Sequence, residues 1–299
     1  MAEVTVVKCQ ILCTTKARNW RRILHFIHSY SIRTLARISK HNKNIVMSTT
    51  GPVSVKDKVV LVTGANRGIG KAFVEVFLQH GASKVYAGVR NLETAQCFAG
   101  EARVVPLYMD LSQPSSIQQA AEQSSDVDIV VNNAGLLTRI TPLEESAVAR
   151  LEEQMQVNVY GLIHMAQSYL PILTKKSSSA FVQLNSVASF RCGLPEVSTY
   201  CASKAAAYSI TQALRQTTPN VRFVSVHPGP IRTEMIVNAS AELAAMSEPP
   251  DQVAEEVISA LASPTEIFHV FPDSKSKNLY QHLQEYTKVV IEDGNSYGL

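Results

Sequence analysis

The chain has 299 residues, of which 45% are hydrophobic and 18% charged, as is typical of a soluble globular protein. It contains no run of about 18 apolar residues, which argues against a membrane-spanning helix. The net charge of +3 is uneven, because residues 1–50 hold nine Lys and Arg against the single acid Glu3 and so carry +8, which leaves −5 for the rest. Attraction to nucleic acid would therefore concern only this first part, and we expect the folded body to bind none.

The cysteines argue against a disulfide scaffold and against a zinc site. They are odd in number and show no CxxC spacing. We therefore expect a reducing compartment and no metal. The five positions are Cys9, Cys13, Cys97, Cys192 and Cys201.

Residues 1–54 form a basic leader ahead of a single domain expected over residues 55–299. The leader is rich in arginine, and its apolar residues between Trp20 and Leu35 recur at roughly helical spacing. This composition is typical of an organelle transit peptide. Two interpretations stay open. A genuine transit peptide would place the protein in mitochondria, whereas a true start at Met47, with the leader as upstream sequence or a disordered extension, would leave it cytoplasmic.

From Lys56 onward, short apolar runs alternate with segments of helical length. Strands of nearly continuous apolar residues, separated by helices, indicate a parallel sheet covered on both faces. The sequence therefore predicts one doubly wound α/β domain with about seven strands, whose ligands bind beyond the carboxyl ends of the strands. The expected strands are Val59–Thr63, Lys84–Val89, Val104–Met109, Asp128–Asn132, Phe181–Ser186, Val221–His227 and Ile267–Phe271. The expected helices are Lys71–His80, Ile117–Gln123, Ser146–Leu173, Ser198–Gln216 and Gln252–Ala262.

The first strand runs into a glycine-rich turn with the spacing TGxxxGxG. Its glycines permit a tight turn and let backbone N–H groups approach a pyrophosphate, at which the following helix directs its positive end. The spacing differs from the commonest dinucleotide fingerprint, GxGxxG, and an ordinary structural turn is the alternative. The candidate cofactor-binding residues in this turn are Thr63, Gly64, Asn66, Arg67, Gly68, Ile69 and Gly70.

The end of the second strand predicts NADP(H) rather than NAD(H). An acid there would bind the ribose 2′-hydroxyl, whereas an arginine accommodates a 2′-phosphate. This strand is followed by Arg90, with no acid in reach, and Arg67 in the glycine turn is a second cation near the same position. The alternative for either arginine is an ordinary solvated charge.

Four residues form a candidate catalytic set. Tyr200 and Lys204 stand at i and i+4, one turn apart on the same helix face, and a neighbouring ammonium would help a phenol to exchange protons near neutrality. Ser186, at the end of the fifth strand, would hydrogen-bond a substrate oxygen, with Ser189 as the alternative hydroxyl. Asn158 lies inside the long expected helix among apolar neighbours, which favours a buried amide over a surface position.

Together, the TGxxxGxG turn, the Asn-Asn-Ala-Gly of residues 132–135 and the four catalytic candidates resemble the classical type of the short-chain dehydrogenase/reductase family, over about residues 56–272. The resemblance implies a Rossmann domain that interconverts a carbonyl compound and an alcohol by hydride transfer with NADP(H). Tyr200 would be the general acid/base and Ser186 would orient the substrate oxygen. Lys204 would lower the pKa of Tyr200 and hold the nicotinamide ribose, and Asn158 would help to hold a water that connects Lys204 to solvent.

The resemblance also implies cofactor contacts after later strands. Asp110 would bind the adenine amine, although capping of the following helix is an equally ordinary role. The segment after the sixth strand resembles the family's PGxxxT, with Thr233 as the hydroxyl partner of the nicotinamide carboxamide and His227 as a structural residue. The residues implied at these strand ends are Asp110, Leu111, Asn133, Ala134, Gly135, Pro228, Gly229, Ile231 and Thr233.

The expected partner is a small-molecule carbonyl compound or alcohol, and family members are commonly dimers or tetramers, which implies a homodimer or homotetramer. The Ala/Ser-rich segment 234–250 is the expected lid, and its shortness favours an open pocket for small or varied substrates. Two other functions stay open. One is a catalytically idle NADPH-binding regulatory protein on the same fold. The other is a nucleic-acid binder resting on residues 8–43, although the folded body lacks interleaved aromatic and basic residues.

Overall fold

A computed structural model describes residues 50–237 and 244–287 of the chain. The transit-peptide prediction therefore falls outside the described residues, as does part of the expected lid. Val53 and Val55 are buried in the core, and the Val53 N–H donates to the carbonyl oxygen of Leu261 at 2.8 Å.

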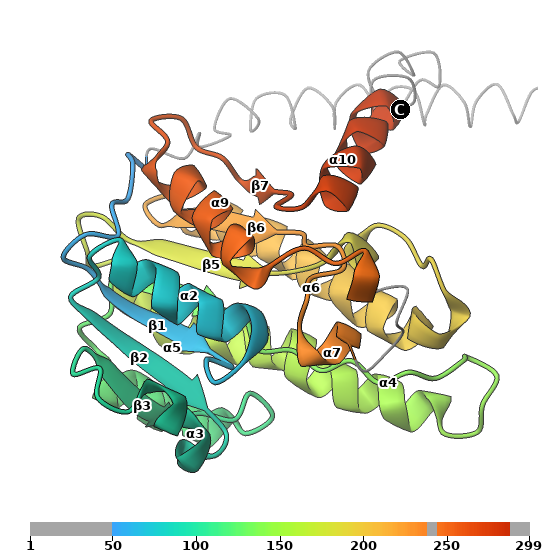
Figure 1. The fold of residues 1–299 in the computed structure, drawn as a ribbon, viewed down its shortest axis with the longest axis horizontal. Helices are drawn as coiled ribbons and strands as arrows, with labels where there is room; N and C mark the ends of the chain where they lie inside the picture. Colours follow the sequence, from blue (N-terminus) through green and yellow to red (C-terminus); the bar gives the residue numbers. More distant parts are fainter. Residues whose placement is uncertain (1–49, 238–243, 288–299) are drawn as a thin grey trace, which may run out of the picture. The chain divides into compact units, whose positions relative to one another are not determined.

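Seven strands form a single parallel sheet in the order β3-β2-β1-β4-β5-β6-β7 (Figure 1). The prediction of a doubly wound parallel α/β domain is confirmed. The strand order reverses between β1 and β4, and the carboxyl ends of these two strands open the crevice where such folds bind ligands. The strands are β1 Val59–Thr63, β2 Lys84–Val89, β3 Val104–Tyr108, β4 Ile129–Asn132, β5 Ala180–Leu184, β6 Arg222–Val226 and β7 His269–Val270.

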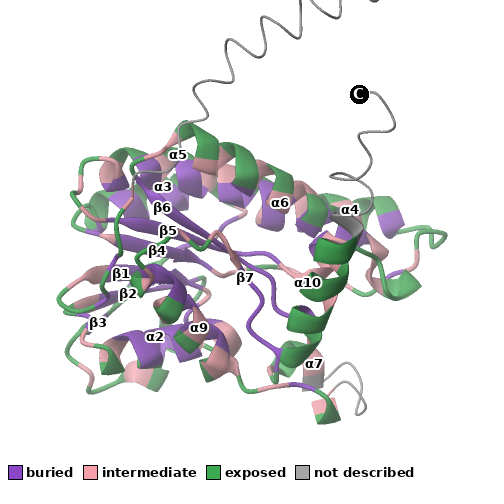
Figure 2. Ribbon diagram, turned by 90° about the horizontal axis from the view of Figure 1, so that it is seen from above, coloured by how far each residue is buried: buried purple, intermediate pink, exposed green. Residues whose placement is uncertain are grey.

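The sheet is buried between two layers of helices (Figure 2). Helices α2 and α9 cover one face, and α3, α5 and α6 cover the other. No helix within the described ranges is long and apolar enough to cross a membrane. The α-helices are α2 Gly68–Gln79, α3 Pro114–Gln123, α4 Ala147–Met155, α5 Gly161–Leu173, α6 Ser198–Thr217, α7 Glu234–Val237, α9 Pro250–Ala262 and α10 Ser274–Thr287. Shorter helical segments are η2 Leu92–Phe98, η3 Gln156–Tyr160, η4 Val187–Ser189 and η5 Pro195–Val197.

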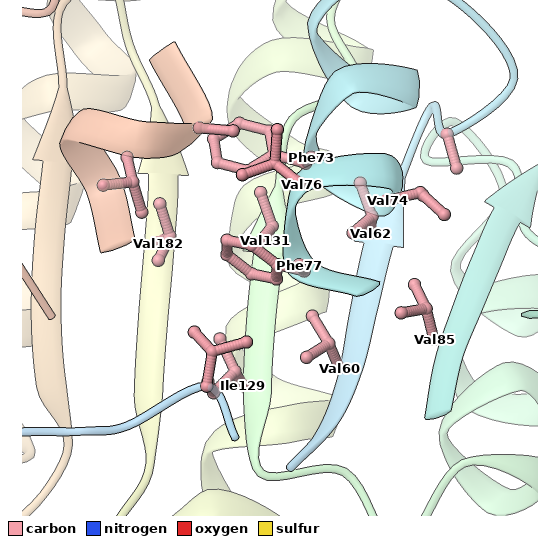
Figure 3. Packing of buried hydrophobic residues seen from close by; sticks show 14 of the residues in the cluster. Val60, Val62, Phe73, Val74, Val76, Phe77, Val85, Ile129, Val131 and Val182 are labelled. Carbon is pink, nitrogen blue, oxygen red and sulfur yellow. The ribbon is translucent and has the colours of Figure 1, made fainter. Parts of the chain in front are cut away.

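Alternate residues of β1, β2, β4, β5 and β6 enter two separate hydrophobic clusters. On β1, Val60 and Val62 face α2 and α9, whereas Leu61 faces the opposite layer. Figure 3 shows the first cluster, in which Phe73 and Phe77 of α2 lie over the strands with their ring centroids 5.5 Å apart. Because both faces are covered in this way, most strand residues on either face are apolar, which explains the nearly continuous apolar runs in the sequence.

Several element ends differ from the predicted ones. Strand β5 ends at Leu184 rather than Ser186, and β7 has only two residues. Helix α2 begins at Gly68, because the glycine turn itself supplies the first helical turn. The helix expected over 146–173 contains the π-helical segment η3, which is typical of functional sites and which apolar periodicity does not reveal. Helix α10 was missed because its residues are mostly polar.

Candidate active site

The glycine turn between β1 and α2 has the shape of an anion-binding cradle. Gly64 and Gly68 have φ angles of 64° and 53°, which only glycine adopts readily. A Cβ on Gly70 would lie 2.1 Å from the carbonyl oxygen of Gly64, so the helix packs directly on the turn. No side chain caps α2, and its first-turn N–H groups can therefore bind an anion. These features fit the pyrophosphate of a dinucleotide.

Thr63 and Asn133 join this turn to the end of β4. The Thr63 hydroxyl oxygen accepts hydrogen bonds from the backbone N–H groups of Asn133 at 3.0 Å and Ala134 at 2.9 Å. In return, the Asn133 side-chain amide donates to the carbonyl oxygen of Thr63 at 2.9 Å. The structure thus brings the glycine turn and the Asn-Asn-Ala-Gly segment together at the switch point of the sheet.

The two arginines expected near a 2′-phosphate lie at the same edge of the sheet. Arg67 directly precedes α2 and pairs with Glu234 of α7 at 2.7 Å, with both side chains more than half exposed. Arg90 is exposed directly after β2, whose residue Gly88 pairs with Thr63 of β1. Glu234 is thus an acidic partner of Arg67 that the sequence did not reveal, because more than 160 residues separate the two.

Asp110 serves the turn that leads into α3. One of its carboxylate oxygens accepts hydrogen bonds from the backbone N–H of Ser112 at 2.9 Å and from its hydroxyl at 2.7 Å. The other oxygen meets only the Gln113 side chain, at 3.4 Å. Asp110 thus fixes the turn before α3 but does not cap that helix, whose N-cap residue is Gln113. Leu111 beside it is buried.

The structure brings Tyr200, Lys204 and Ser186 together at the carboxyl ends of the central strands. Ser186 lies two residues beyond β5 and not at its end as predicted, and its hydroxyl oxygen accepts from the Ala188 N–H at 3.1 Å. The Tyr200 phenol lies near enough to Ser186 for that serine to lower its pKa. The alternative hydroxyl, Ser189, is buried at the end of η4. These contacts favour Ser186 as the serine of the site.

The electrostatics of Tyr200 differ from the expectation. Burial raises the pKa of Tyr200 to about 12, against a lowering by the nearby Ser186. Lys204 does not reverse this, because its ammonium donates to the carbonyl oxygen of Leu184 at 2.8 Å and lies 5.8 Å from the centre of the Tyr200 ring. Burial also lowers the pKa of Lys204 to about 8. As folded, the chain therefore holds Tyr200 as a neutral phenol, which is a proton donor.

Asn158 lies in the π-helical segment η3 and is buried, as its apolar neighbours suggested. Its side-chain amide forms two hydrogen bonds with the backbone of Leu136, at 2.8 and 2.9 Å, and donates to the Ser203 hydroxyl of α6 at 2.9 Å. A Cβ on Gly135 would lie 3.2 Å from the Asn158 oxygen and 3.5 Å from Lys204 Nζ. Asn158 thus fastens the segment after β4 against the helix that carries Tyr200.

The segment after β6 folds back over the glycine turn. A Cβ on Gly68 would lie 3.0 Å from the Thr233 methyl group, and the Gly229 N–H donates to the buried carboxylate of Asp273 at 2.7 Å. The other Asp273 oxygen accepts from the Ser276 N–H at 2.9 Å, which caps α10. Sequence reasoning missed Asp273, although Asp-Ser-Lys-Ser is typical of a helix start. Ile231 is buried, and the carbonyl oxygen of Pro228 accepts from Val187 N–H at 3.1 Å.

Two histidines lie behind this site, His227 buried and His269 half-buried. Burial is the main cause that lowers the pKa of His227 to about 3 and the pKa of His269 to about 4. His227 Nε2 and His269 Nδ1 lie 3.2 Å apart. The ranges 50–237 and 244–287 contain no group of three or more His, Cys, Asp or Glu residues that could hold a metal ion. The pair is therefore a neutral, hydrogen-bonded part of the interior.

These histidines should make the fold acid-sensitive. The unfolded chain binds both protons near pH 6.5, whereas the folded chain binds them only near pH 4 and below, so their contribution is fully present above pH 6.5 and is lost as the pH falls. We expect the free energy of unfolding in urea to drop by about 4 kcal/mol between pH 6.5 and pH 4.5. His269→Gln should remove about half of that drop. An unchanged drop would assign the acid sensitivity to carboxylates instead.

Comparisons with known proteins agree on the class of protein. A family model described as short chain dehydrogenase matches residues 58–244. An uncharacterised oxidoreductase of Staphylococcus saprophyticus is 30% identical over 245 residues, which cover 75% of this chain and 99% of the relative. A short chain dehydrogenase from Burkholderia cenocepacia in complex with NADP has a TM-score of 0.70 and 30% identity, over 80% of this chain and 99% of its own. An alcohol dehydrogenase from Thermococcus sibiricus complexed with 5-hydroxy-NADP has a TM-score of 0.61 and 26% identity, over 72% and 95%.

Proposed function

The chain belongs to the short-chain dehydrogenase/reductase family of oxidoreductases, and from this premise we propose that it reduces a small carbonyl compound to an alcohol with NADPH, Tyr200 acting as the general acid. The observation that carries the proposal is the contact between Ser186 and the neutral phenol of Tyr200 at the carboxyl edge of the sheet. A hydroxyl pair of this kind can bind one carbonyl oxygen, with Ser186 orienting it and Tyr200 donating the proton.

The site residues fit a nicotinamide dinucleotide. The uncapped start of α2 and the glycine turn would hold the pyrophosphate, Lys204 the nicotinamide ribose, and Thr233 the carboxamide. When bound, the reduced nicotinamide supplies a hydride to the carbonyl carbon. The chain itself contributes position and charge. Asn158 holds the segment after β4 in place, and Lys204 stands behind Tyr200, where its ammonium favours the phenolate left after proton donation.

The preference for NADP(H) rests on Arg67 and Arg90, and two relatives of this fold bind NADP or a derivative of it. Arg67→Ala and Arg90→Ala should each raise the KM for NADPH by about 10-fold to 100-fold, because each removes a charge-assisted hydrogen bond to the phosphate. The KM for NADH should hardly change. Parallel steady-state assays with both cofactors measure this difference.

Glu234 offers a matched control for this experiment. Glu234→Gln breaks the same ion pair as Arg67→Ala but leaves the guanidinium in place. We expect this variant to bind NADPH as tightly as the unmodified chain or more tightly. Weaker NADPH binding in Glu234→Gln would assign the Arg67 effect to the loss of the ion pair rather than of a phosphate contact.

Purified protein, with and without residues 1–46, should be assayed for NADPH oxidation against a panel of aldehydes and ketones. Turnover with any member supports the proposal. NADPH binding without turnover across the panel would favour the catalytically idle regulator, and retention of nucleic acid only by the longer form would favour a nucleic-acid arm. Chiral analysis of the alcohol then defines which face of the carbonyl is attacked.

We further propose a homodimer or homotetramer, an assembly compatible with the exposed apolar side chains Val148 of α4 and Tyr160 of η3. Light scattering measures the oligomeric state directly.

We propose that the protein is cytoplasmic, with mitochondria as the alternative location if the leader is a transit peptide. Fusing residues 1–46 to a fluorescent protein separates the two, since only a transit peptide would carry the fusion into mitochondria.

A further inference from the structure

Ser186 needs support that its strand does not supply. It lies beyond the end of β5, and the last ladder bond before it joins the Asn185 N–H to the carbonyl oxygen of Val226 at 2.8 Å. Its own carbonyl oxygen accepts from the Ser189 N–H at 2.9 Å, which leaves a second lone pair. A serine that orients a substrate oxygen must be held within a fraction of an ångström. A hydrogen-bond donor to the second lone pair of the Ser186 carbonyl oxygen could hold it in this way.

A chain of buried side chains leads to that lone pair. The Asn185 amide nitrogen lies 2.9 Å from the Ser225 hydroxyl, the Ser225 hydroxyl 2.9 Å from His227 Nε2, and His227 Nδ1 3.5 Å from the carbonyl oxygen of Ser186. All three side chains are at most 4% exposed. The chain begins at the residue before Ser186 and returns to Ser186 itself.

The direction of these hydrogen bonds follows from their partners. The Thr211 hydroxyl donates to the carbonyl oxygen of Ala207 at 2.7 Å, so it can only accept from Asn185, which orients the amide with its nitrogen toward both Thr211 and Ser225. Ser225 accepts from this nitrogen and has its own proton free for His227 Nε2. His227 is neutral, and with Nε2 as an acceptor it carries its proton on Nδ1.

The surroundings of His227 favour the same tautomer and fix the ring. His269 Nδ1 lies 3.2 Å from His227 Nε2 and is a second possible donor to it, while the atom facing Nδ1 is a carbonyl oxygen, which can only accept. Phe190, Tyr208 and Phe271 enclose the imidazole, with centroid distances of 4.8, 5.0 and 5.0 Å. The ring therefore cannot turn without disrupting the aromatic packing.

We propose that Asn185, Ser225 and His227 form a hydrogen-bond clamp that sets the position of Ser186, with His227 as the positioning residue that holds its carbonyl group. The proposal rests on the function proposed above in that Ser186 orients the substrate oxygen. The clamp joins the ends of β5 and β6, and the Val187 N–H and Pro228 carbonyl oxygen form a further bond between the same two segments. Without the clamp, we expect the protein to remain folded but the position of Ser186 to be less restrained.

The kinetic test compares variants that keep or remove the Nδ1 donor. His227→Phe removes it, whereas His227→Asn retains an N–H donor attached at the same Cγ. We expect His227→Phe and Ser225→Ala to lower kcat by about 10-fold to 100-fold with little change in NADPH affinity, as for a misplaced reacting group. His227→Asn should keep most of kcat. Equal losses in His227→Asn and His227→Phe would overturn the proposal, because they would report packing alone.

Ser124→Ala is the matched control for Ser225→Ala, since Ser124 is equally buried, bonds to Tyr169 at 3.0 Å and lies outside the site. It should lower the Tm without changing kcat. If Ser225→Ala behaves in the same way, the clamp has no positioning role. Should His227→Phe fail to fold, Ser225→Ala and His227→Asn still decide the question.

A readout that does not depend on turnover separates this proposal from the proposed function. Nitrogen-15 NMR of the histidine side chains distinguishes a proton on Nδ1 from one on Nε2. We expect His227 in the Nδ1–H form, and a proton on Nε2 would overturn the clamp even in an active enzyme. An Nδ1–H signal in a chain that reduces no carbonyl compound would uphold the hydrogen bonds and count against the proposed function instead.

Discussion

Tyr200→Phe should lower kcat by about 1,000-fold while leaving NADPH affinity nearly unchanged. The substitution removes one oxygen atom and keeps the ring that packs near Lys204. Because burial holds this phenol neutral, it is the proton donor that carbonyl reduction requires, and its loss leaves the developing alkoxide without an acid. Single-turnover assays together with fluorescence titration of NADPH measure the two effects separately.

Tyr169→Phe is the control for this experiment. The pKa of Tyr169 is likewise raised by burial, and its hydroxyl bonds to Ser124 on the side of the sheet covered by α3 and α5. It should lose some stability and no activity. If Tyr200→Phe retained the kcat of the unmodified chain, a different group would have to be the acid, and the proposed mechanism would be wrong.

Gly70→Ala should both destabilise the fold and abolish tight cofactor binding. The added Cβ would lie 2.1 Å from the Gly64 carbonyl oxygen and 2.6 Å from the Asn133 amide nitrogen, and the first of these is backbone that cannot turn aside. Separating α2 from the turn should cost about 3 kcal/mol of stability, as overpacking does elsewhere. It would also move the N–H groups that face the pyrophosphate, so we expect NADPH affinity to fall at least about 10-fold.

The same substitution at Gly51 provides the comparison, because a Cβ there meets no atom within 4 Å. Gly51→Ala should leave the urea midpoint and the NADPH titration unchanged. A folded Gly70→Ala protein with unimpaired NADPH affinity would contradict the account of the glycine turn as a closely packed phosphate cradle.

The sequence predicted the sheet well because its strands are buried on both faces. Strands β1 and β2 begin and end as predicted, since in each an apolar run stops at glycine or at a charged residue. The end of β5 was wrong because apolar patterning does not show where ladder bonds stop, and Ser186 lies just past that point. The π-helical segment around Asn158 was missed for a similar reason, since one wider turn leaves the apolar stripe almost unchanged.

Other parts of the site depend on contacts between distant residues. The parallel sheet and its loops bring these residues into place, and no local sequence pattern predicts such pairs. The pairs are Glu234 beside Arg67, Asp273 beside Gly229, and Ser225 and His227 beside the Ser186 segment. The pKa of Tyr200 is a further case, because motif spacing places Lys204 one turn away but does not reveal that its ammonium donates to Leu184.

Asp273 has a consequence for how the domain opens. One carboxylate holds both the Gly229 N–H of the cofactor loop and the first turn of α10, and it is 1% exposed. Detaching α10 would leave one oxygen of that buried carboxylate without its Ser276 hydrogen bond. Local unfolding of α10 therefore costs free energy, and it also weakens the support of the Gly229 loop. By linkage, a ligand that tightens the loop must also protect α10 from fraying. The two segments therefore belong to one cooperative unit, although more than 40 residues separate Gly229 from Asp273.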